Sequence, residues 1–221
     1  AMASSTNNRL LLNYHDAVLY ESDLALLESP TAWLNDACMN FAMTRLGQKF
    51  SQQVVLDPAV VAFFVHQCVD EDEIQEFMQG NPQLQTSDLI FIPINNGHAP
   101  SNTWHKQRGT HWSLLVIVRN DHGLVRYLHF DSVSGSNACT AQAVAEKFSR
   151  IFKPQPNNVV VVECKTPQQS NGYDCGLHVV ASAQVLATMD DVNEDSLNEI
   201  QQTDMFELRK TLAADAVKLA K

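Results

Sequence analysis

The 221-residue chain is poor in cysteine, and its few cysteines form no local pairs. There are five of them, spread widely along the chain, at Cys38, Cys68, Cys139, Cys164 and Cys175, and no apolar signal segment is evident. Disulfide-rich secreted domains carry an even and closely spaced set, so we expect a reducing, intracellular setting. Because no CxxC pair occurs, a cysteine-rich zinc site is not expected.

Long apolar runs and an excess of positive charge are also missing. The longest apolar runs fall far short of the roughly 18 residues that a membrane-spanning helix requires, so we expect no membrane partner. Lysine and arginine total 15 against 25 aspartates and glutamates, which gives a formal net charge of −10. Nucleic-acid binding depends on neutralising phosphates with cations, so nucleic acid is not expected as a partner, whereas a basic protein surface would be attracted.

The composition that is present suits one globular domain. Hydrophobic residues make up 45% of the chain and charged residues 18%, enough apolar material for a sizeable core. We expect residues 1–9, which open with Ala1 before Met2, to be a disordered N-terminus or a remnant of expression. Residues 10–221 are expected to form a single domain, active as a monomer.

Hydrophobic periodicity divides the chain into helices, a group of strands, and helices again. The first 80 residues predict helices, one of them with Asp57 as N-cap and Pro58 at its first position. Residues 95–110 predict a long polar loop, of the kind that often carries function in a compact domain. Strands are predicted over 88–94, 111–118, 124–132 and 158–164 (the last one buried), and later helices over 137–152, 175–189 and 203–221. This order predicts an α+β fold.

The predicted hairpin of 111–132 places a histidine beside a carboxylate. A turn centred near Asp121 sets His111, at the mouth of the first strand, opposite Asp131, at the end of the second. Directly opposed Cβ atoms lie ~5 Å apart, so Asp131 can orient the imidazole, and a histidine held by an acid is two thirds of a nucleophilic triad. His129 shares the strand face of Asp131, so it could line the site or pack in the core, and packing is expected.

The stretch QQSNGYDCG (168–176) supplies a candidate for the third group. Cys175 precedes a predicted helix, so its sulfur lies at the positive end of the helix dipole, which favours the thiolate. The N–H of Cys175 and the side chain of Gln169 could donate to an oxyanion, an arrangement suited to acyl transfer through a thioester. The residues alone leave a second interpretation open, because free cysteine is among the most buried residue types and a structural thiol would look the same.

A metal hydrolase is the alternative enzyme class, because five histidines crowd this region: His98, His105, His111, His122 and His129. They fall on loops and on alternating strand positions. The two-histidine helix pair and the CxxC spacing of zinc sites are both missing, so no metal is predicted.

Four segments together resemble one enzyme family. WLND (33–36), THWSLLV (110–116), HFDSVSGSN (129–137) and QQSNGYDCG (168–176), in this order, are similar to the Ulp/sentrin-specific cysteine proteases, which process ubiquitin-like modifiers. The resemblance covers the chain from about residue 12 onward. It implies a papain-like fold of the Ulp type, in which helices flank a small mixed sheet, and it implies no cofactor.

By this resemblance, His111 is the general base, Asp131 its orienting acid, Cys175 the nucleophile and Gln169 the oxyanion-hole side chain. The substrate-binding residues are implied in the same way. Trp112 matches the family tryptophan that covers the diglycine tail of the modifier, and Trp33 and Asp36 match positions that contact this tail, Asp36 through an arginine. For Trp33, core packing at a helix start is the alternative.

The opening LNYHDAVLYESDLALL and the stretch GTHWSLLV are most similar to the deneddylase branch of the family. The resemblance therefore implies NEDD8 as partner and substrate, either as a precursor or conjugated to lysine. SUMO is the alternative modifier, and a non-catalytic modifier-binding module is the alternative class. The presence of all four catalytic residues favours an active enzyme. The 95–110 loop is where specificity could differ.

Overall fold

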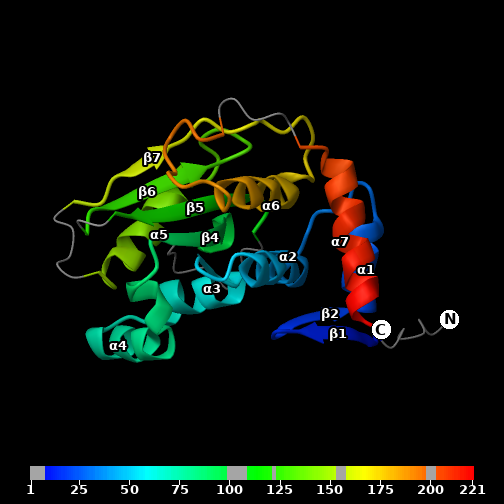
Figure 1. The fold of residues 1–221 in the computed structure, drawn as a ribbon, viewed down its shortest axis with the longest axis horizontal. Helices are drawn as coiled ribbons and strands as arrows, with labels where there is room; N and C mark the ends of the chain where they lie inside the picture. The colour runs from blue at the N-terminus through cyan, green and yellow to red at the C-terminus, as the bar shows by residue number, and fades with distance from the viewer. Residues whose placement is uncertain (1–7, 99–108, 121–122, 153–157, 198–202) are drawn as a thin grey trace.

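The structure, a computed structural model, describes residues 8–98, 109–120, 123–152, 158–197 and 203–221. Helices and strands alternate irregularly along the chain (Figure 1). Their order is β1 (Leu10–Tyr14), β2 (Ala17–Tyr20), α1 (Glu21–Glu28), α2 (Asp36–Lys49), β3 (Val54–Val55), α3 (Pro58–Gln67), α4 (Glu71–Gly80), the 3-10 helix η1 (Pro82–Gln85), β4 (Leu89–Asn95), the 3-10 helix η2 (Asn96–His98), β5 (Trp112–Arg119), β6 (Val125–Phe130), α5 (Ala138–Ser149), β7 (Val161–Glu163), α6 (Cys175–Leu186) and α7 (Met205–Leu219).

The central sheet has five strands in the order β3-β4-β5-β6-β7. Strand β5 pairs antiparallel with both β4 and β6, whereas the outer pairs β3–β4 and β6–β7 are parallel. The sheet is therefore small and mixed, and helices flank it in Figure 1. This arrangement confirms the predicted α+β class.

Alternate residues of the central strands enter two different hydrophobic cores, because successive side chains of a strand point to opposite faces. On β5, Leu114 and Val116 belong to the core shared with α2, α6 and α7. Leu115 and Ile117 belong to the core shared with α3, α4 and α5. Burial on both faces makes β5 and β6 a rigid base for the residues at their ends.

Side-chain caps fix the starts of two helices near the site. Asp57 accepts a hydrogen bond from Ala59 N at 2.8 Å, and Pro58 is the first residue of α3, as predicted. At the start of α2, Asn35 Oδ1 accepts from Cys38 N at 2.9 Å. The second cap sets where the WLND segment enters its helix.

The prediction that the first 80 residues are helical was wrong at the N-terminus. Strands β1 and β2 form a two-stranded antiparallel sheet there. His15 and Asp16 join them with φ of 47° and 69°, the two left-handed conformations that a tight hairpin turn requires. A His-Asp turn is a weaker hairpin signal than the usual Asn-Gly pair, and the apolar residues on either side of it also suit a helix.

Strand β7 also differs from the prediction, which described 158–164 as a buried strand. The strand covers only Val161–Glu163 and lies at the edge of the sheet beside β6. Val160 and Val162 are exposed. A run of valines therefore marks β propensity here, not burial on both faces.

Helices α1 and α7 lie together at one end of the molecule, next to the β1–β2 hairpin (Figure 1). Asn8 and Arg9, which the sequence prediction placed in a disordered segment, contact α1. Asn8 Nδ2 donates to Ser22 Oγ at 2.8 Å, and Arg9 Nε donates to Glu21 Oε1 at 2.9 Å. Both residues are therefore held against α1.

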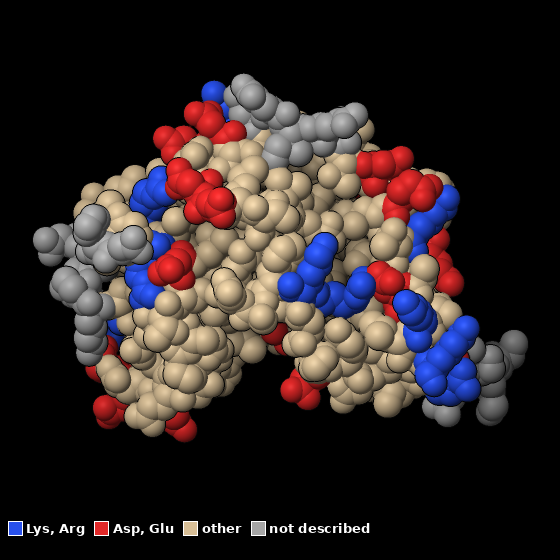
Figure 2. Space-filling model, in the orientation of Figure 1, with Lys and Arg blue, Asp and Glu red and all other residues tan. Residues whose placement is uncertain are grey.

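Figure 2 shows acidic and basic groups mixed over one face of the molecule, with no large basic patch on that face. The view is consistent with the acidic balance of the sequence. Within the described residues, the helices are too short or too polar to act as a bilayer-spanning segment.

Candidate active site

The β5–β6 hairpin brings His111 and Asp131 to the same end of the sheet, but not in the predicted register. Leu114 pairs with Phe130 and Arg119 with Val125, so continuing this register sets Asp131 level with residue 113 instead of His111. The prediction of direct opposition was therefore wrong by two residues.

The cause lies in the turn. Asn120 N donates to Leu124 O at 3.1 Å, and Gly123 has a φ of 75°, a conformation that glycine adopts at no steric cost. The turn is thus centred one residue later than expected. His111 and Asp131 are diagonal neighbours, and diagonal pairs remain within reach of long side chains.

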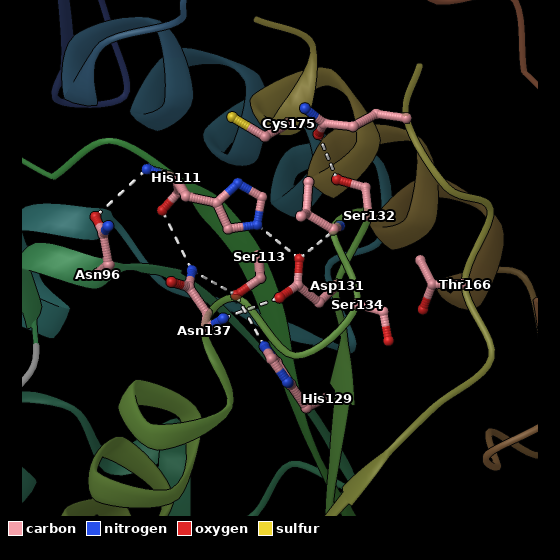
Figure 3. Close-up of polar contacts among 12 residues, drawn as sticks. Asn96, His111, Ser113, His129, Asp131, Ser132, Ser134, Asn137, Thr166 and Cys175 are labelled. Carbon is pink, nitrogen blue, oxygen red and sulfur yellow. Dashed lines mark hydrogen bonds and ion pairs between the residues drawn. The ribbon is translucent and has the colours of Figure 1, made fainter. Parts of the chain in front are cut away.

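His111 and Asp131 are in direct contact despite this shift. His111 Nε2 lies 2.6 Å from Asp131 Oδ1 (Figure 3). The carboxylate is held from two further sides, because Oδ1 also accepts from Val133 N at 2.9 Å and Oδ2 accepts from Asn137 N at 3.0 Å. A carboxylate fixed by three donors is a rigid orienting group for the imidazole.

The electrostatics of the pair favour an imidazolium facing a carboxylate. Burial alone would lower the pKa of His111, but hydrogen bonds to Asp131 and Cys175 and their negative charges outweigh it and raise the pKa to about 9. Burial would raise the pKa of Asp131, but the hydrogen bonds from His111 and from the two backbone N–H groups hold it below its usual value. His111 is therefore protonated at neutral pH in this arrangement.

Cys175 is the first residue of α6, and its thiol is the other hydrogen-bond partner of the His111 ring. The sulfur lies at the N-terminus of a 12-residue helix, where a negative charge is stabilised. Gly176 allows this helix start to pack closely, because a Cβ there would meet Met39 Sδ at 2.9 Å. Cys175 itself is 1% exposed, which the structural-thiol interpretation would also predict.

Gln169 lies on the loop that leads to α6, and its amide is oriented from both ends. Its Oε1 accepts from Ser132 Oγ at 2.7 Å, and its Nε2 donates to Asn171 O at 2.5 Å. The amide group has two N–H bonds, so one donor remains after the contact with Asn171. The structure thus gathers His111, Asp131, Cys175 and Gln169 at one end of the sheet.

The comparison with known proteins agrees with this geometry. The profile of the Ulp1 protease family, C-terminal catalytic domain, matches residues 32–220. The chain belongs to the Ulp1 protease family. As a member, it is a cysteine-type peptidase, which confirms the class that the motifs indicated.

Relatives of this Ulp1-family chain match most of its length. A probable sentrin-specific protease 8 from Dictyostelium discoideum is 30% identical over 212 residues, covering 89% of this chain and 84% of that protein. NEDD8-specific protease 1 from Arabidopsis thaliana is 33% identical, covering 84% and 78%. The solved C-terminal Ulp1 protease domain in complex with Smt3, the yeast orthologue of SUMO, has a TM-score of 0.70 at 21% identity, covering 98% and 90%. This last likeness confirms the Ulp-type fold.

Two tryptophans of this Ulp1-family site are stacked on each other beside the thiol. The ring centroids of Trp33 and Trp112 are 5.6 Å apart with an interplanar angle of 18°. Trp112 is fully buried and donates from Nε1 to Leu34 O at 2.8 Å, whereas the half-buried Trp33 donates from Nε1 to Cys175 Sγ at 3.1 Å. Trp33 is thus the indole in contact with the sulfur, and Trp112 packs against the face of the Trp33 ring.

Asp36 is exposed in the first turn of α2. Desolvation and the charge of the nearby Asp57 raise its pKa. Among the described residues, no ion pair involves Asp36. Because the carboxylates of Asp36 and Asp57 are close together, they would stabilise a basic side chain bound beside them.

A buried polar network below the His111–Asp131 pair was not predicted. Asn137 Nδ2 donates to His111 O at 3.2 Å and to Ser113 Oγ at 2.9 Å (Figure 3). His129, fully buried as expected from its strand face, lies 2.9 Å from Ser113 Oγ through its Nε2. Asn137 is the first residue of the helix predicted over 137–152, but it precedes α5 and its side chain makes no cap bond to that helix. The observed contacts make it a support for the backbone of His111.

The remaining histidines and thiols are placed differently. His98 is buried, and desolvation followed by the charge of His66 lowers its pKa to about 4. His105 and His122 lie outside the described residues, as does the 99–108 part of the 95–110 loop. Within the described part of the chain, no cluster of three or more potential ligands is arranged to hold a metal. Burial raises the pKa of both Cys38 and Cys164 to about 12, so these thiols stay protonated.

Proposed function

We propose that this protease hydrolyses the bond after the C-terminal diglycine of a ubiquitin-like modifier, with NEDD8 as the preferred modifier. The observation that carries the proposal is the His111 ring, hydrogen-bonded to Asp131 on one side and to Cys175 on the other. The relatives named for sentrin and NEDD8 support a modifier as substrate, and the name of the Arabidopsis relative supports NEDD8. Both precursors and lysine conjugates present the required bond.

In the proposed reaction, the Cys175 thiolate attacks the carbonyl carbon of the last glycine, forming a C–S bond while an electron pair moves to the carbonyl oxygen. The Cys175 N–H and the free N–H of Gln169 Nε2 donate to this oxyanion. When the C–N bond breaks, the His111 imidazolium gives its proton to the departing amine. His111 then takes a proton from water, which hydrolyses the thioester and releases the thiol group.

Trp33, Trp112 and Asp36 are proposed to bind the C-terminal tail of the modifier. A flat indole beside the sulfur admits residues without side chains and excludes larger ones, so Trp33 and Trp112 are proposed to select the diglycine. Because Trp33 contacts the sulfur directly, an entering carbonyl group must displace it. Asp36, with Asp57 nearby, is proposed to receive an arginine of the tail. An intracellular setting remains a prediction from cysteine usage.

Side-by-side hydrolysis of NEDD8, SUMO and ubiquitin carrying a C-terminal fluorophore tests the modifier assignment. We expect kcat/KM for NEDD8 to exceed that for the other two by about tenfold or more, since specificity arises from differential transition-state binding. The Cys175→Ala variant measured in parallel gives the background. Faster turnover of SUMO would overturn the NEDD8 assignment and leave the chemistry intact, whereas no turnover of any modifier would overturn both.

Replacing Gln169 with alanine tests the oxyanion role. Loss of one preorganised donor is expected to lower kcat roughly 10²-fold to 10³-fold, with KM changed much less, because the bond strengthens only in the transition state. The matched control is Ser132→Ala, which removes the partner of Gln169 Oε1 but leaves the donor, so a smaller loss of kcat is expected. Equal kcat for Gln169→Ala and the unmodified protein would contradict the role.

A further inference from the structure

Arg209, on α7, places a buried guanidinium behind the loop that carries the proposed nucleophile. Its side chain is 2% exposed. It donates to Leu26 O at 3.0 Å, to Ala32 O at 2.8 Å and to Asp174 Oδ1 at 3.2 Å. One residue thus ties the C-terminal helix to α1, to the segment between α1 and α2, and to the residue directly before Cys175.

Asp174 stands at the cap position of α6, but it does not cap the helix. A capping aspartate normally accepts from the N–H of the second or third helical residue. Here the side chain makes no such bond, because Oδ1 faces Arg209 and Oδ2 accepts from Asn171 Nδ2 at 2.8 Å. None of the hydrogen bonds among the described residues uses the N–H of Cys175 or Gly176. These donors remain available at the helix start.

A free carboxylate at this position would oppose catalysis in two ways. A negative charge one residue from the sulfur disfavours the thiolate. A carboxylate turned onto the helix start would also occupy N–H groups that an oxyanion needs. Among the described residues, the basic or titratable groups near this region are His111, just before β5, His178 of α6 and Arg209 of α7, and Arg209 forms the ion pair with Asp174.

We propose that Arg209 is a positioning residue that holds the Asp174 carboxylate away from the start of α6 and offsets its charge, so that the first N–H groups of the helix serve the thiolate and the oxyanion. This inference rests on the proposed role of Cys175. It assigns a function in the reaction to a helix far along the chain from every motif of the site.

The test compares Arg209→Met, which keeps much of the apolar stem but removes the charge, with the double variant Arg209→Met/Asp174→Asn. Alkylation of Cys175 by iodoacetamide is followed against pH by mass spectrometry of the peptide that contains it. In Arg209→Met we expect the alkylation profile to move to higher pH, with a rate near neutrality about tenfold lower. We also expect a lower kcat with little change in KM. In the double variant the alkylation profile should return toward that of the unmodified protein, because the unpaired charge is gone.

Two further variants separate this role from simple structural support. Arg45→Met breaks the ion pair of Arg45 with Asp215, which also fastens α7, here to α2, and should leave the alkylation profile unchanged. Arg209→Lys keeps the positive charge and should retain a near-normal alkylation profile. This profile can be measured even if Arg209→Met fails to fold. An unshifted profile in a folded Arg209→Met, or a shift that persists in the double variant, would overturn the proposal.

Alkylation does not depend on the modifier, so the two proposals fail in different ways. If the unmodified protein hydrolyses no modifier but Arg209→Met still shifts the alkylation profile, the modifier proposal fails and the positioning role stands. If Cys175 in the unmodified protein reacts no faster than the exposed Cys139, both the nucleophile assignment and this inference fail.

Discussion

Replacing Cys175 with alanine is expected to abolish hydrolysis of a NEDD8 C-terminal substrate, with kcat falling roughly 10⁵-fold to 10⁶-fold. The effect is this large because the sulfur is the atom proposed to form the thioester, and no nearby group can replace it. His111 and Asp131 would keep their mutual contact, since neither bond of the carboxylate to the backbone involves the thiol. The measurement is the rate of fluorophore release, together with the dissociation constant for intact NEDD8, which should change little.

The matched control is Cys164→Ala. Cys164 is a partly buried thiol whose pKa burial raises to about 12, and its Sγ donates to Val162 O at 3.4 Å. Its removal should leave kcat unaffected. A NEDD8 derivative with a C-terminal electrophile should form an adduct with Cys164→Ala but not with Cys175→Ala. Adduct formation that survives in Cys175→Ala would show that another group is the nucleophile.

The four residues of the proposed catalytic centre could be found from the sequence because each lies in a short motif at the end of a regular element. His111 directly precedes a strand, Asp131 follows one, and Cys175 begins a helix. The hairpin pattern placed His111 beside Asp131, and the resemblance to the protease family added Cys175 and Gln169 to them. The register of the hairpin could not be fixed in the same way. It depends on which residue adopts the left-handed conformation, and this is Gly123, two residues beyond the centre of the predicted turn.

Contacts made across large sequence separations could not be predicted. Arg209 lies 35 residues from Asp174 and 183 from Leu26, and nothing in its helix distinguishes it from a solvent-exposed arginine. The contacts of the Asn137 side chain with His111 O and Ser113 Oγ could not be predicted either, because the sequence shows that an asparagine can donate but not which partner it meets. The β1–β2 hairpin was missed for a related reason, since the apolar content of its strands also suits a helix.

Replacing Asp131 with asparagine is expected to lower kcat by roughly 10²-fold to 10⁴-fold while the fold persists. The carboxylate accepts from His111 and Val133 N on one oxygen and from Asn137 N on the other. An amide has a single acceptor oxygen, so one of these N–H groups must face an NH₂ group. Without the negative charge of Asp131 the pKa of His111 is raised less. A smaller fraction of His111 then carries the proton that the departing amine needs.

The contact between His111 and Asp131 also determines how stability and activity change with pH. The pKa of His111 is raised to about 9, so its stabilising contribution is fully present below its ordinary value of 6.5 and is lost as pH rises through about 9. Activity that needs the imidazolium should fall over the same alkaline limb. In Asp131→Asn the alkaline fall in activity should move to lower pH, because the pKa of His111 is raised less. The stability that the charged His111 contributes to the unmodified protein near neutrality should then be lost in the variant.

A second histidine–acid pair in the same sheet offers the control for Asp131→Asn. His129 Nδ1 lies 2.7 Å from Glu163 Oε1, and the Glu163 side chain is 46% exposed. Glu163→Gln also removes a carboxylate that contacts a histidine, and kcat should fall less than about fivefold because Glu163 is half exposed and bonds to His129 instead of His111. Its alkaline limb should not move. If both variants shifted the limb equally, the general loss of negative charge would explain the effect, and the contact of Asp131 with His111 would lose its special role.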